Sequence, residues 1–514
     1  MKLDNKTSKV QASTAPDHEV VVIGTGMAGI AVAVKLIEAG LREFVMLDRS
    51  AAPGGVWQNH TYPGVGVDTP AVAYDYSFSR NKDWSSVWVD GPEINANHMR
   101  VAAEHGLAPY FRLNTSIVRQ VWDEANGMWR LETADDRVIT TRFLITATGQ
   151  FPEQKPSAIP GVDEFKGKLQ QSAHWDRDYD HTCERVAVIG TGASAVQIVP
   201  TMAPTVGQLD VFQRTPVFCF PRGNPKFSPR VAKALATPRA GRIYYWAYKL
   251  LADVLVSTLT LMPGAIVRPI MRSLDGRARA LNRRGLQRLV HDETTRTALT
   301  PNYGLMVKRP TGSSDYLQAF NRDNVGLITT SIDRITDKGI RTVDGIEHEY
   351  DTIVLATGHI LFSDPEYYQP GTVIGRNGFD LGEFYQEHGV QAYEGMAVPG
   401  LPNRWMMSGP YSFSLSPHIP VEVYAESIVS IITATKRAGG IVVEADQRAH
   451  EKYHAKVRRR ARNLEWYMME LNKGVTTYYA NSQNQVAALR LTSLTALAAR
   501  TRRTPLANYR VDTL

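Results

Sequence analysis

Two short apolar runs, at residues 19–23 and 185–189, open two similar stretches of the chain. Continuous β-branched runs of this length are typical of strands that are buried on both faces of a parallel sheet. Each run passes directly into a glycine-rich turn, and the first is followed by a helical pattern at residues 30–39. The pattern therefore predicts two strand–turn–helix units, each followed by a further strand.

The rest of the pattern is consistent with an α/β fold. Further strands are predicted at residues 43–47, 117–122, 128–133, 142–146, 325–329 and 352–355, and helices at 93–105 and 421–438. The strands at 142–146 and 352–355 both end in Ala-Thr-Gly, which supports two related units. Prolines and a glycine between residues 152 and 161 interrupt regular structure and indicate a crossover between domains.

We predict an α/β fold with two Rossmann-like dinucleotide-binding domains. The predicted division is a disordered polar lead-in at residues 1–17, a first domain at 18–148 and 385–514, and a second domain at 149–384. In this division, residues 399–410 return the chain to the first domain, and the helix at 421–438 completes it.

A helical insertion is predicted in the second domain, at residues 224–300, which are rich in Ala, Leu and Arg. Its apolar centre, residues 250–267, contains Asp253, Pro263 and Gly264. A charge and two helix breakers argue against an integral membrane span. The wall of a substrate cavity or a buried core helix is favoured, and peripheral membrane contact is the lesser alternative.

Composition and charge add few restrictions. A chain of 514 residues is long enough for more than one domain. Two cysteines, Cys183 and Cys219, cannot form a disulfide framework, so we expect a reducing, cytoplasmic compartment. The formal charge is +7, but the basic residues are scattered apart from a run at 456–462, for which a solvated helix face is favoured. No nucleic-acid-binding module, metal site or oligomeric state is predicted.

The first glycine-rich turn has the pattern of a dinucleotide site. Gly24, Gly26 and Gly29 have the spacing G-x-G-x-x-G between the predicted strand and helix. The glycines allow a tight turn and let a pyrophosphate approach the helix N-terminus. Asp48 follows the next strand, 24 residues after Gly24, where an acid accepts a hydrogen bond from a ribose hydroxyl.

The second glycine-rich turn differs from the first at its end. Gly190, Gly192 and Ala195 repeat the spacing, with alanine as a tolerated small residue in the third place. Arg214 lies 24 residues after Gly190, at the offset where the first unit has its acid. An arginine binds a ribose 2′-phosphate, which an acid would repel. FAD in the first unit and NADPH in the second fit this pair.

The loop after the first unit combines several unusual residues. Gly54-Gly55 lets backbone approach a flat ligand closely, and Trp57 offers a broad apolar face. Tyr62-Pro63-Gly64 predicts a tight turn. Asp68 then follows a stretch with almost no other charge, so its carboxylate is either a cap or part of a site.

The loop also resembles that of a known family. Gly-Gly-x-Trp-x4-Tyr-Pro-Gly-x3-Asp over residues 54–68 is similar to the loop of class B flavin monooxygenases, in particular the Baeyer–Villiger monooxygenases. Residues 165–175 resemble the family signature F-x-G-x3-H-x3-W, with Gln171 in place of the histidine. Trp175 favours the Baeyer–Villiger branch over N-oxidising relatives, and His174 is expected to be a partly exposed side chain.

The resemblance implies roles for further residues. Residues 308–324 are similar to the family segment that bears the active-site arginine, so Arg309 would face the flavin. Lys308 would join Arg214 and Thr215 around the 2′-phosphate. The remaining flavin contacts implied by the family are Gly55, Trp57, Asp68 and Gly409.

The chemistry of the family requires such residue types. Reduced flavin and dioxygen form a C4a-peroxyflavin, whose nucleophilic form is an anion. Arginine stays cationic at any working pH, so Arg309 suits the stabilisation of this anion and of the oxyanion formed from a ketone. Asp68 would orient Arg309 through a charge-assisted, bidentate bond. Arg309 and Asp68 are therefore the predicted catalytic residues.

Four functions are consistent with these observations to different degrees. The leading hypothesis is an NADPH-dependent flavin monooxygenase that uses dioxygen to insert oxygen next to the carbonyl of a small hydrophobic substrate, giving an ester or lactone. The alternative, motivated by Gln171, oxygenates nitrogen or sulfur with the same cofactors. A flavin disulfide reductase requires a close cysteine pair, and Cys183 and Cys219 lie 36 positions apart. A catalytically silent flavoprotein is the remaining option.

Overall fold

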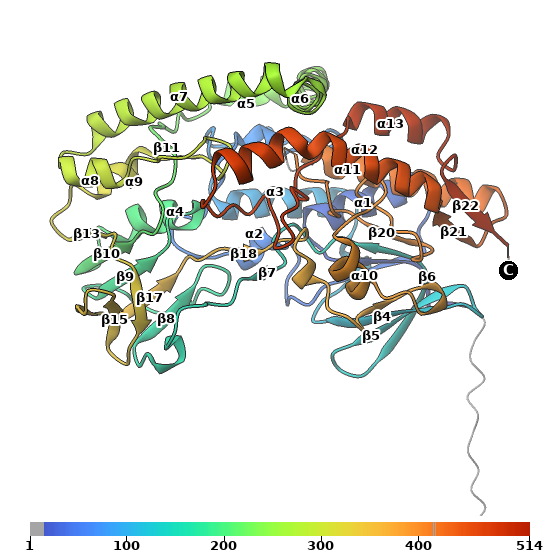
Figure 1. Ribbon diagram of the computed structural model, residues 1–514. Coiled ribbons are helices and arrows are strands. Elements are labelled where there is room, and N and C mark those ends of the chain that lie inside the picture. Colours follow the sequence, from blue (N-terminus) through green and yellow to red (C-terminus); the bar gives the residue numbers. More distant parts are fainter. Residues whose placement is uncertain (1–14, 415, 417, 514) are drawn as a thin grey trace, which may run out of the picture.

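The computed structural model describes residues 15–414, 416 and 418–513, which contain two large sheets with helices packed around them (Figure 1). Of the predicted disordered lead-in at residues 1–17, residues 1–14 lie outside the described residues. Asp17 is described, and its carboxylate accepts hydrogen bonds from the N–H and hydroxyl of Thr140, both at 2.8 Å. Both sheets are built around parallel strands, as expected for the predicted α/β class.

The first sheet contains the first predicted unit. Its order is β19 (Val373–Ile374), β4 (Ile117–Asp123), β5 (Met128–Thr133), β6 (Val138–Thr146), β1 (His18–Ile23), β2 (Phe44–Leu47) and β3 (Phe111–Arg112), with β20 (Arg404–Met406) also paired with β6. Strand β1 is central and parallel to β2 and β6. Its residues Val20, Val21 and Val22 are fully buried, as the apolar run predicts. Helix α1 (Met27–Glu38) packs against α3 (Gly91–Glu104) and α11 (His418–Arg437).

The second sheet contains the second predicted unit. Its five strands are all parallel, in the order β13 (Val325–Ile328), β10 (Gln208–Phe212), β9 (Arg185–Ile189), β17 (Thr352–Leu355) and β8 (Lys168–Gln171). Helix α4 (Ala193–Met202) follows β9 and packs against α9 (Ser314–Ala319). A separate antiparallel sheet is formed by β14 (Ile332–Ile335), β15 (Gly339–Thr342) and β16 (Glu347–Glu349).

The C-terminal part of the chain returns to the first sheet. Strand β20 pairs with β6, and α11 packs on α1, as predicted for residues 399–410 and 421–438. Strand β19, which lies inside the range predicted for the second domain, already pairs with β4 of the first sheet. The predicted domain boundaries themselves remain a prediction.

Smaller elements complete the chain. They are β7 (Glu153–Gln154) paired with β18 (His359–Ile360), β11 (Cys219–Phe220) with β12 (Thr311–Gly312), β21 (Val442–Ala445) with β22 (Tyr509–Asp512), and the helices α10 (Leu381–His388), α12 (Gln447–Glu465) and α13 (Leu494–Arg503). The basic run at 456–462 lies on α12, where Arg459 and Arg462 are exposed. A solvated helix face was the favoured interpretation of this run, and it is confirmed.

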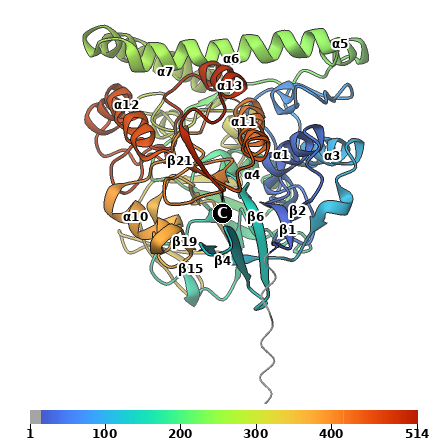
Figure 2. The ribbon, with the colours of Figure 1, turned by 90° about the vertical axis from the view of Figure 1, so that its right-hand side faces the viewer.

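Helices occupy most of residues 224–300, as the periodicity predicts. They are α5 (Pro229–Leu235), α6 (Pro238–Leu261), α7 (Gly264–Leu289) and α8 (Glu293–Ala298). Figures 1 and 2 show α6 and α7 lying across one end of the molecule, each seen along its length in one view and end-on in the other. The breakers Pro263 and Gly264 mark the bend of 120° between them.

The apolar centre of this region is not a buried core helix. Leu250, Leu251 and Leu261 expose 63%, 60% and 57% of their surface. The buried core helix, one of the two favoured interpretations, was wrong because an apolar run indicates that a face requires cover, whereas it does not identify what covers it. The wall of a substrate cavity remains a prediction. No single helix in the described part of the chain is long and apolar enough to cross a membrane; α6 and α7 together meet that criterion by length and composition alone.

Candidate active site between two dinucleotide units

The first glycine turn has the geometry of a dinucleotide site. Gly24 has a φ of +113°, and a Cβ atom there would lie 2.4 Å from the carbonyl oxygen of Ala147. A Cβ atom on Gly29 would lie 2.0 Å from the carbonyl oxygen of Gly24, so helix and turn pack too closely for any side chain. Helix α1 begins after Gly26 with no side-chain cap and no acid in its described first turn. Its first N–H groups can therefore bind an anion.

Asp48 lies at the end of β2, as predicted, and is 9% exposed. Its carboxylate accepts hydrogen bonds from the backbone N–H and hydroxyl of Thr25, at 2.8 and 2.6 Å. The backbone N–H of Ser50 donates to the other oxygen at 2.9 Å. Asp48 thus holds the glycine turn in place, and its contact with a ribose remains a prediction.

The loop after β2 folds back over the glycine turn. The N–H of Gly54 donates to the carbonyl oxygen of Thr25 at 3.2 Å. A Cβ atom on Gly55, whose φ is +61°, would lie 2.9 Å from the Cα atom of Gly26. The loop contains a short helix, α2 (Val56–Asn59), which the pattern did not predict. The predicted turn at residues 62–64 is present and is closed by a hydrogen bond from Val65 N–H to Tyr62 O at 3.2 Å.

The second glycine turn repeats the geometry of the first. Gly190 has a φ of +119°, and a Cβ atom there would lie 2.4 Å from the carbonyl oxygen of Ala356. At Gly192, by contrast, a Cβ atom would meet no described atom within 4 Å, so the space above this turn is open. Helix α4 begins after Gly192 without a side-chain cap, and Ala195 in its first turn is fully buried.

Two cations lie at the far end of this turn. Arg214 is exposed and forms no ion pair with the described residues. Burial, together with the positive charge of Arg214, lowers the pKa of Lys308. The carbonyl oxygen of the adjacent Thr215 accepts a hydrogen bond from Thr191 at 2.7 Å. Two neighbouring cations without an acid are suited to a doubly charged anion such as a 2′-phosphate.

Arg309 and Asp68, 241 positions apart in the chain, form a bidentate ion pair. Nη2 of Arg309 lies 2.6 Å from one carboxylate oxygen and Nε lies 2.5 Å from the other. The two side chains are 29% and 19% exposed. Burial opposes the charge of Arg309, but Asp68, together with Tyr478 and Tyr74, outweighs it and raises the pKa of the guanidinium above its usual range. The predicted contact is thus present, and Arg309 stays cationic.

Four tyrosines lie near enough to this ion pair to interact with its charge. The hydroxyl groups of Tyr74, Tyr248, Tyr478 and Tyr479 all interact electrostatically with Arg309. Burial, and then the negative charge of Asp68, raises the pKa of Tyr74 to about 12. The hydroxyls of Tyr478 and Tyr479 are hydrogen-bonded at 3.0 Å. Sequence reasoning missed all four, because none lies in a motif or in a periodic segment near Arg309.

Trp57 and Arg222 extend the same surroundings. The ring of Trp57 packs edge-on against Tyr74, with centroids 5.4 Å apart. Arg222 lies over the ring of Trp88, at 4.4 Å, and donates to the carbonyl oxygen of Val67 at 3.5 Å. Burial lowers the pKa of Arg222, while the negative charge of Asp68 opposes this shift. A second guanidinium, which the sequence did not reveal, therefore lies near the predicted catalytic carboxylate.

The segment that resembles the family signature contacts the loop. The carbonyl oxygen of Trp175 accepts a hydrogen bond from Thr61 at 3.4 Å. Gln171 ends strand β8, and His174 is exposed, as expected. The rings of His60 and His359 stack nearby with centroids 5.2 Å apart. This histidine pair joins the loop to the segment after β17 and was not predicted.

Gly409 lies just beyond β20 at the first sheet. A Cβ atom there would lie 2.5 Å from the carbonyl oxygen of Gly395, so only glycine fits this position without a shift of the backbone. The neighbouring Met407 N–H donates to Thr146 O at 2.8 Å, which fixes the turn to the end of β6. The flavin contact of Gly409 remains a prediction.

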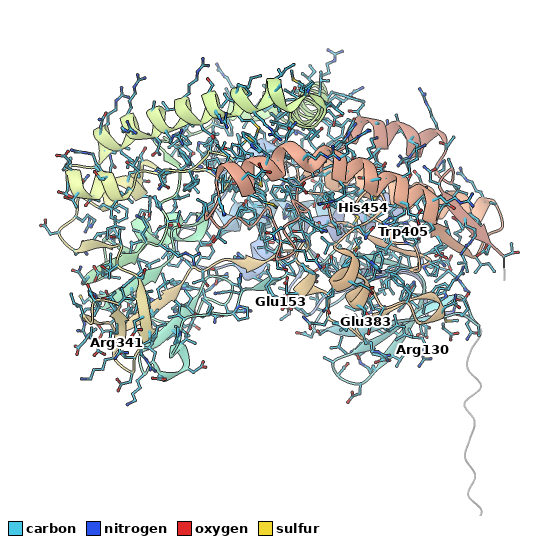
Figure 3. The ribbon with its side chains drawn as sticks, viewed as in Figure 1. Arg130, Glu153, Arg341, Glu383, Trp405 and His454 are labelled. Atoms are coloured by element: carbon cyan, nitrogen blue, oxygen red, sulfur yellow. The ribbon has the colours of Figure 1, made fainter. Side chains whose placement is uncertain are left out.

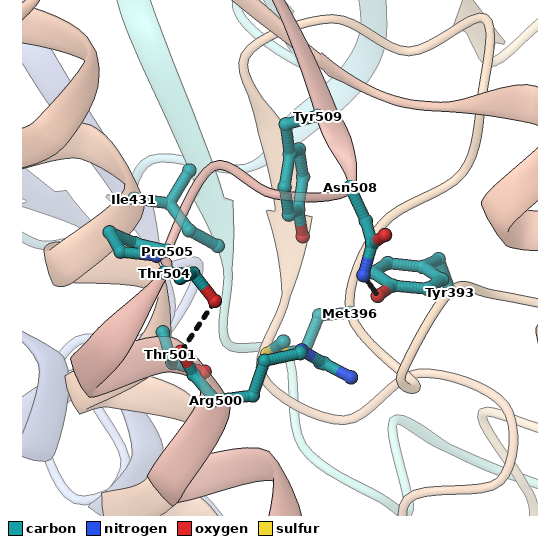
Figure 4. Close-up of a pocket in the computed structure, with 9 residues that line it drawn as sticks. All are labelled: Tyr393, Met396, Ile431, Arg500, Thr501, Thr504, Pro505, Asn508 and Tyr509. Atoms are coloured by element: carbon teal, nitrogen blue, oxygen red, sulfur yellow. Dashed lines mark hydrogen bonds between the residues drawn. The ribbon is translucent and has the colours of Figure 1, made fainter.

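Other chemistry is not supported in the described part of the chain. Cys183 is exposed, Cys219 is buried, and both are free thiols, so there is no redox pair of the disulfide reductase type. No group of three or more His, Cys, Asp or Glu side chains among the described residues could hold a metal ion. The cavity between α13 and β22 in Figure 4 has a volume of about 10 Å³, enough for a single water.

Several known proteins resemble this chain over most of its length. The family model described as pyridine nucleotide-disulphide oxidoreductase matches residues 18–238. An uncharacterized monooxygenase of Mycobacterium tuberculosis is 35% identical over 468 residues, covering 90% of each chain. A Baeyer–Villiger monooxygenase of Streptomyces coelicolor is 30% identical over 499 residues, covering 96% of this chain and 92% of that protein. The fold is similar to that of OTEMO in complex with FAD and NADP, with a TM-score of 0.84 and 23% identity over 97% of this chain and 100% of that one.

The two glycine turns and the ion pair define a protein that binds two dinucleotides, of the class that combines a flavin with a nicotinamide cofactor. The identity with the Streptomyces coelicolor enzyme extends over both units and the segment that bears Arg309. The chain therefore belongs to the Baeyer–Villiger monooxygenase family and is a flavin-dependent oxidoreductase. The resemblance recognised in the sequence is confirmed.

Proposed function

We propose that Arg309, held by Asp68, is the catalytic cation of this Baeyer–Villiger monooxygenase. The observation that supports this role is the bidentate contact, with distances of 2.5 and 2.6 Å, between two predicted residues from distant segments. A guanidinium gripped at two nitrogens has little freedom to turn away from a developing negative charge. Asp68 is accordingly proposed as the residue that positions Arg309.

The residues present fit the two cofactors. Uncapped helix N-termini at Gly26 and Gly192 suit pyrophosphate groups, and the cations Arg214 and Lys308 suit a 2′-phosphate. FAD is the ligand of the first unit and NADPH of the second. When bound, FAD that has been reduced by NADPH activates dioxygen for insertion next to a ketone carbonyl. Gly55, Trp57 and Gly409 are proposed flavin contacts, and Thr215 is a proposed contact to NADPH.

Arg309 contributes by electrostatic stabilisation. Its charge is fixed before reaction, so no reorganisation is required when negative charge develops on the substrate oxygen. Because the pair is only partly exposed, this charge acts in surroundings of lower dielectric than water and its effect is correspondingly greater. Arg222 adds a second positive charge near Asp68.

The four tyrosines support a hydrophobic ketone as substrate. Their rings give apolar surface beside Arg309, while their hydroxyls stay protonated because burial raises the pKa of each. A protonated phenol donates hydrogen bonds and adds no negative charge next to the ion pair. The proposed substrate is a small hydrophobic carbonyl compound, together with dioxygen. We also keep the predicted cytoplasmic location, which rests on the two unpaired cysteines.

Oxygenation of nitrogen or sulfur is the less favoured hypothesis, since it was motivated only by Gln171. Gln171 ends a regular parallel strand, and its carbonyl oxygen accepts from the N–H of His174 at 3.0 Å. Nothing in this local geometry alters the position of Arg309. We therefore assign any effect of Gln171 to the coupling between NADPH oxidation and product formation.

The reaction is tested by incubating the holoenzyme with NADPH, labelled dioxygen and a panel of ketones. We expect labelled ester or lactone in proportion to NADPH consumed. Labelled hydrogen peroxide alone, or labelled product only from added amines and sulfides, would contradict the assignment. The panel should range from small cyclic to bulky polycyclic ketones, because the structure specifies apolar character more closely than size.

A further inference from the structure

Helices α6 and α7 expose an unusual amount of apolar surface. Eleven of the eighteen large apolar side chains exposed in the described part of the chain lie on these two helices. Proteins that stay in water as monomers rarely concentrate apolar side chains in this way, because the contact with water is unfavourable. We call this surface the outer face of α6 and α7.

The exposed residues follow helical spacing and therefore form continuous stripes. On α6 the stripe contains Ile243, Leu250, Val254 and Leu261. On α7 it contains Ile266, Ile270, Leu274 and Leu281. Val267, Met271 and Ala278 of α7 are instead buried against the body of the protein. Helix α7 is thus apolar on two faces, of which only one is covered.

The same two helices carry most of the positive charge. Within the ranges of α6 and α7 there are ten Lys and Arg residues and only Asp253 and Asp275 as acids, a formal charge of +8. The whole chain has a formal charge of +7, so the remainder is close to neutral. Seven of the arginines are exposed, and none of these seven has a described carboxylate within ion-pair distance.

Both acids point away from the outer face. Asp253 accepts hydrogen bonds from Ser493, Leu494 and Thr495 at the start of α13. Asp275 is 4% exposed and accepts from Tyr467 and Leu305. The outer face therefore presents apolar side chains and unpaired arginines together, without negative charge from either helix.

A hollow at the bend between the helices combines the same features. It has a volume of about 380 Å³ and is lined by Gly264, Ala265, Arg268, Pro269, Arg272 and Trp466. The guanidinium groups of Arg268 and Arg272 lie 4.6 and 5.3 Å from the ring of Trp466. Paired guanidinium groups over an aromatic ring suit a phosphate group that lies at the boundary of an apolar layer.

We propose that the outer face of α6 and α7 binds the surface of a membrane rich in anionic phospholipids. Both helices lie across one end of the molecule, so both can enter the interface at once (Figures 1 and 2). Apolar side chains enter the boundary of the acyl chains, and the arginines bind the phosphates. The arginines also argue against a second copy of this chain as the occupant, because the symmetric contact would bring the unpaired cations together.

The arrangement places the site next to the bound surface. Tyr248 lies on α6, two residues before Leu250, and interacts electrostatically with Arg309. One helix therefore carries lipid-facing residues on its outer side and a neighbour of the catalytic cation on its inner side. The membrane contact itself does not depend on the proposed reaction.

The test is co-sedimentation of the FAD-loaded enzyme with vesicles of phosphatidylcholine alone or mixed equally with phosphatidylglycerol. We expect binding to the mixed vesicles, which weakens as salt is raised, and little binding to phosphatidylcholine. R283Q/R284Q should weaken the partition about thirtyfold, because each substitution removes the attraction of one arginine to the anionic surface. L250S/L251S should weaken it at least about tenfold. All of these side chains are exposed, so FAD content should be unchanged.

Matched controls separate the outer face from general charge and stickiness. R130Q/K338Q removes the same charge from exposed residues elsewhere; Arg130 lies at the opposite end of the molecule (Figure 3). V343S/I346S removes apolar side chains that are 65% and 54% exposed. Both controls should bind within about twofold of the unaltered enzyme. Equal losses in the controls, or equal binding to both kinds of vesicle, would overturn the proposal.

Self-association is the competing outcome and is measured separately. In analytical ultracentrifugation without lipid, we expect the unaltered enzyme and L250S/L251S to have the same state of association. A dimer that forms at the concentrations used and is lost in this variant would assign the outer face to a second copy, against our proposal. Catalytic turnover enters neither measurement, so failure here leaves the assignment of the reaction untouched.

Discussion

The two glycine turns have almost the same backbone but different ends. Gly24 and Gly190 have φ values of +113° and +119°, and a Cβ atom on either would lie 2.4 Å from a carbonyl oxygen just beyond the neighbouring strand of its sheet, β6 or β17. After the strand that follows, the first unit has Asp48, which is buried and bonded to Thr25, and the second has Arg214, which is exposed and unpaired among the described residues. The shared backbone suits a pyrophosphate in both units, and we propose that the end residue decides which ribose is accepted.

The turns also differ in how they are covered. Gly55 of the loop lies directly on Gly26, whereas the space above Gly192 is open. We therefore expect a cofactor in the first unit to be held under the loop, as suits a flavin that stays bound through many turnovers. We expect a cofactor in the second unit to be free to leave, as suits a nicotinamide that must be exchanged. The following predictions test this contrast, from the largest effect to the smallest.

Arg309 lies in neither glycine turn, so its replacement should leave flavin reduction by NADPH largely intact. Arg309→Ala should lower the rate of product formation about 1000-fold, because a preorganised charge is removed from the reacting centre. Flavin reduction by NADPH, measured by stopped-flow absorbance, should stay within about threefold of the unaltered enzyme. Arg309→Lys is the matched control, because it keeps the charge but not the bidentate contact. Its rate of product formation should lie between those of the unaltered enzyme and Arg309→Ala. Product formation at the original rate in Arg309→Ala would refute the assigned role.

Arg214 should matter to one cofactor only. Arg214→Ala should lower kcat/KM for NADPH about 10- to 100-fold through the loss of charge-assisted bonds, with little change for NADH. Steady-state kinetics with both coenzymes measure the difference, and flavin content checks that the first unit is intact. Arg341→Ala, in the hairpin of β14 and β15, is the control. Equal losses with NADPH and NADH would contradict a 2′-phosphate site.

Gly192 and Gly26 occupy equivalent places but should respond differently. A Cβ atom on Gly192 meets no described atom within 4 Å, so Gly192→Ala should leave the free energy of unfolding unchanged without cofactor. It should weaken NADPH binding roughly tenfold. The added methyl group would crowd the pyrophosphate expected over this turn and remove about one hydrogen bond between it and the start of α4. A Cβ atom on Gly26 would lie 3.3 Å from the Cα atom of Gly55, so Gly26→Ala should loosen the loop itself. Calorimetry measures the stability of the two variants, and coenzyme titration measures their affinity for NADPH. A loss of stability in Gly192→Ala would contradict the open space above that turn.

The smallest effect at neutral pH concerns His60, in the covering loop. Burial, together with the neighbouring His359 and His174, lowers the pKa of His60 from 6.5 to about 4. Below pH 6.5 the unfolded chain gains a proton that the folded chain does not bind, so stability falls with pH down to about 4. The slope from this group is at most about 1.4 kcal/mol per pH unit. In denaturant titrations, the free energy of unfolding should depend less steeply on pH in His60→Asn than in the unaltered enzyme, by the contribution of one bound proton. The exposed His388→Asn serves as the matched control.

The sequence revealed what depends on local pattern and spacing. The two units, the roles of their glycines and the offsets of Asp48 and Arg214 follow from rules that apply within about thirty residues. The contact between Arg309 and Asp68, which are far apart in the chain, required the resemblance to a family. Periodicity alone could not have brought these two residues together.

What the sequence missed has a common physical cause. Tyr478 and Tyr479 reach Arg309 from a segment with no periodic pattern, so only the tertiary fold brings them near. A buried core helix was one of two interpretations of the apolar stretch of α6, because hydrophobic periodicity is the same for a face covered by protein and for a face covered by something else. Strand β19 is only two residues long, which is too short to produce a pattern.

Gln197 of α4 ties the covering loop to the second unit. Its side chain accepts a hydrogen bond from Tyr62 and donates one to the carbonyl oxygen of Gly66, both at 2.9 Å. A Cβ atom on Gly64 would lie 2.5 Å from the carbonyl oxygen of Gln197, so the loop and helix α4 cannot slide past each other freely. A loop fastened to both units is a physical route for coupling between their ligands, and such coupling is reciprocal: whatever factor FAD imposes on the affinity for NADPH, NADPH must impose on FAD.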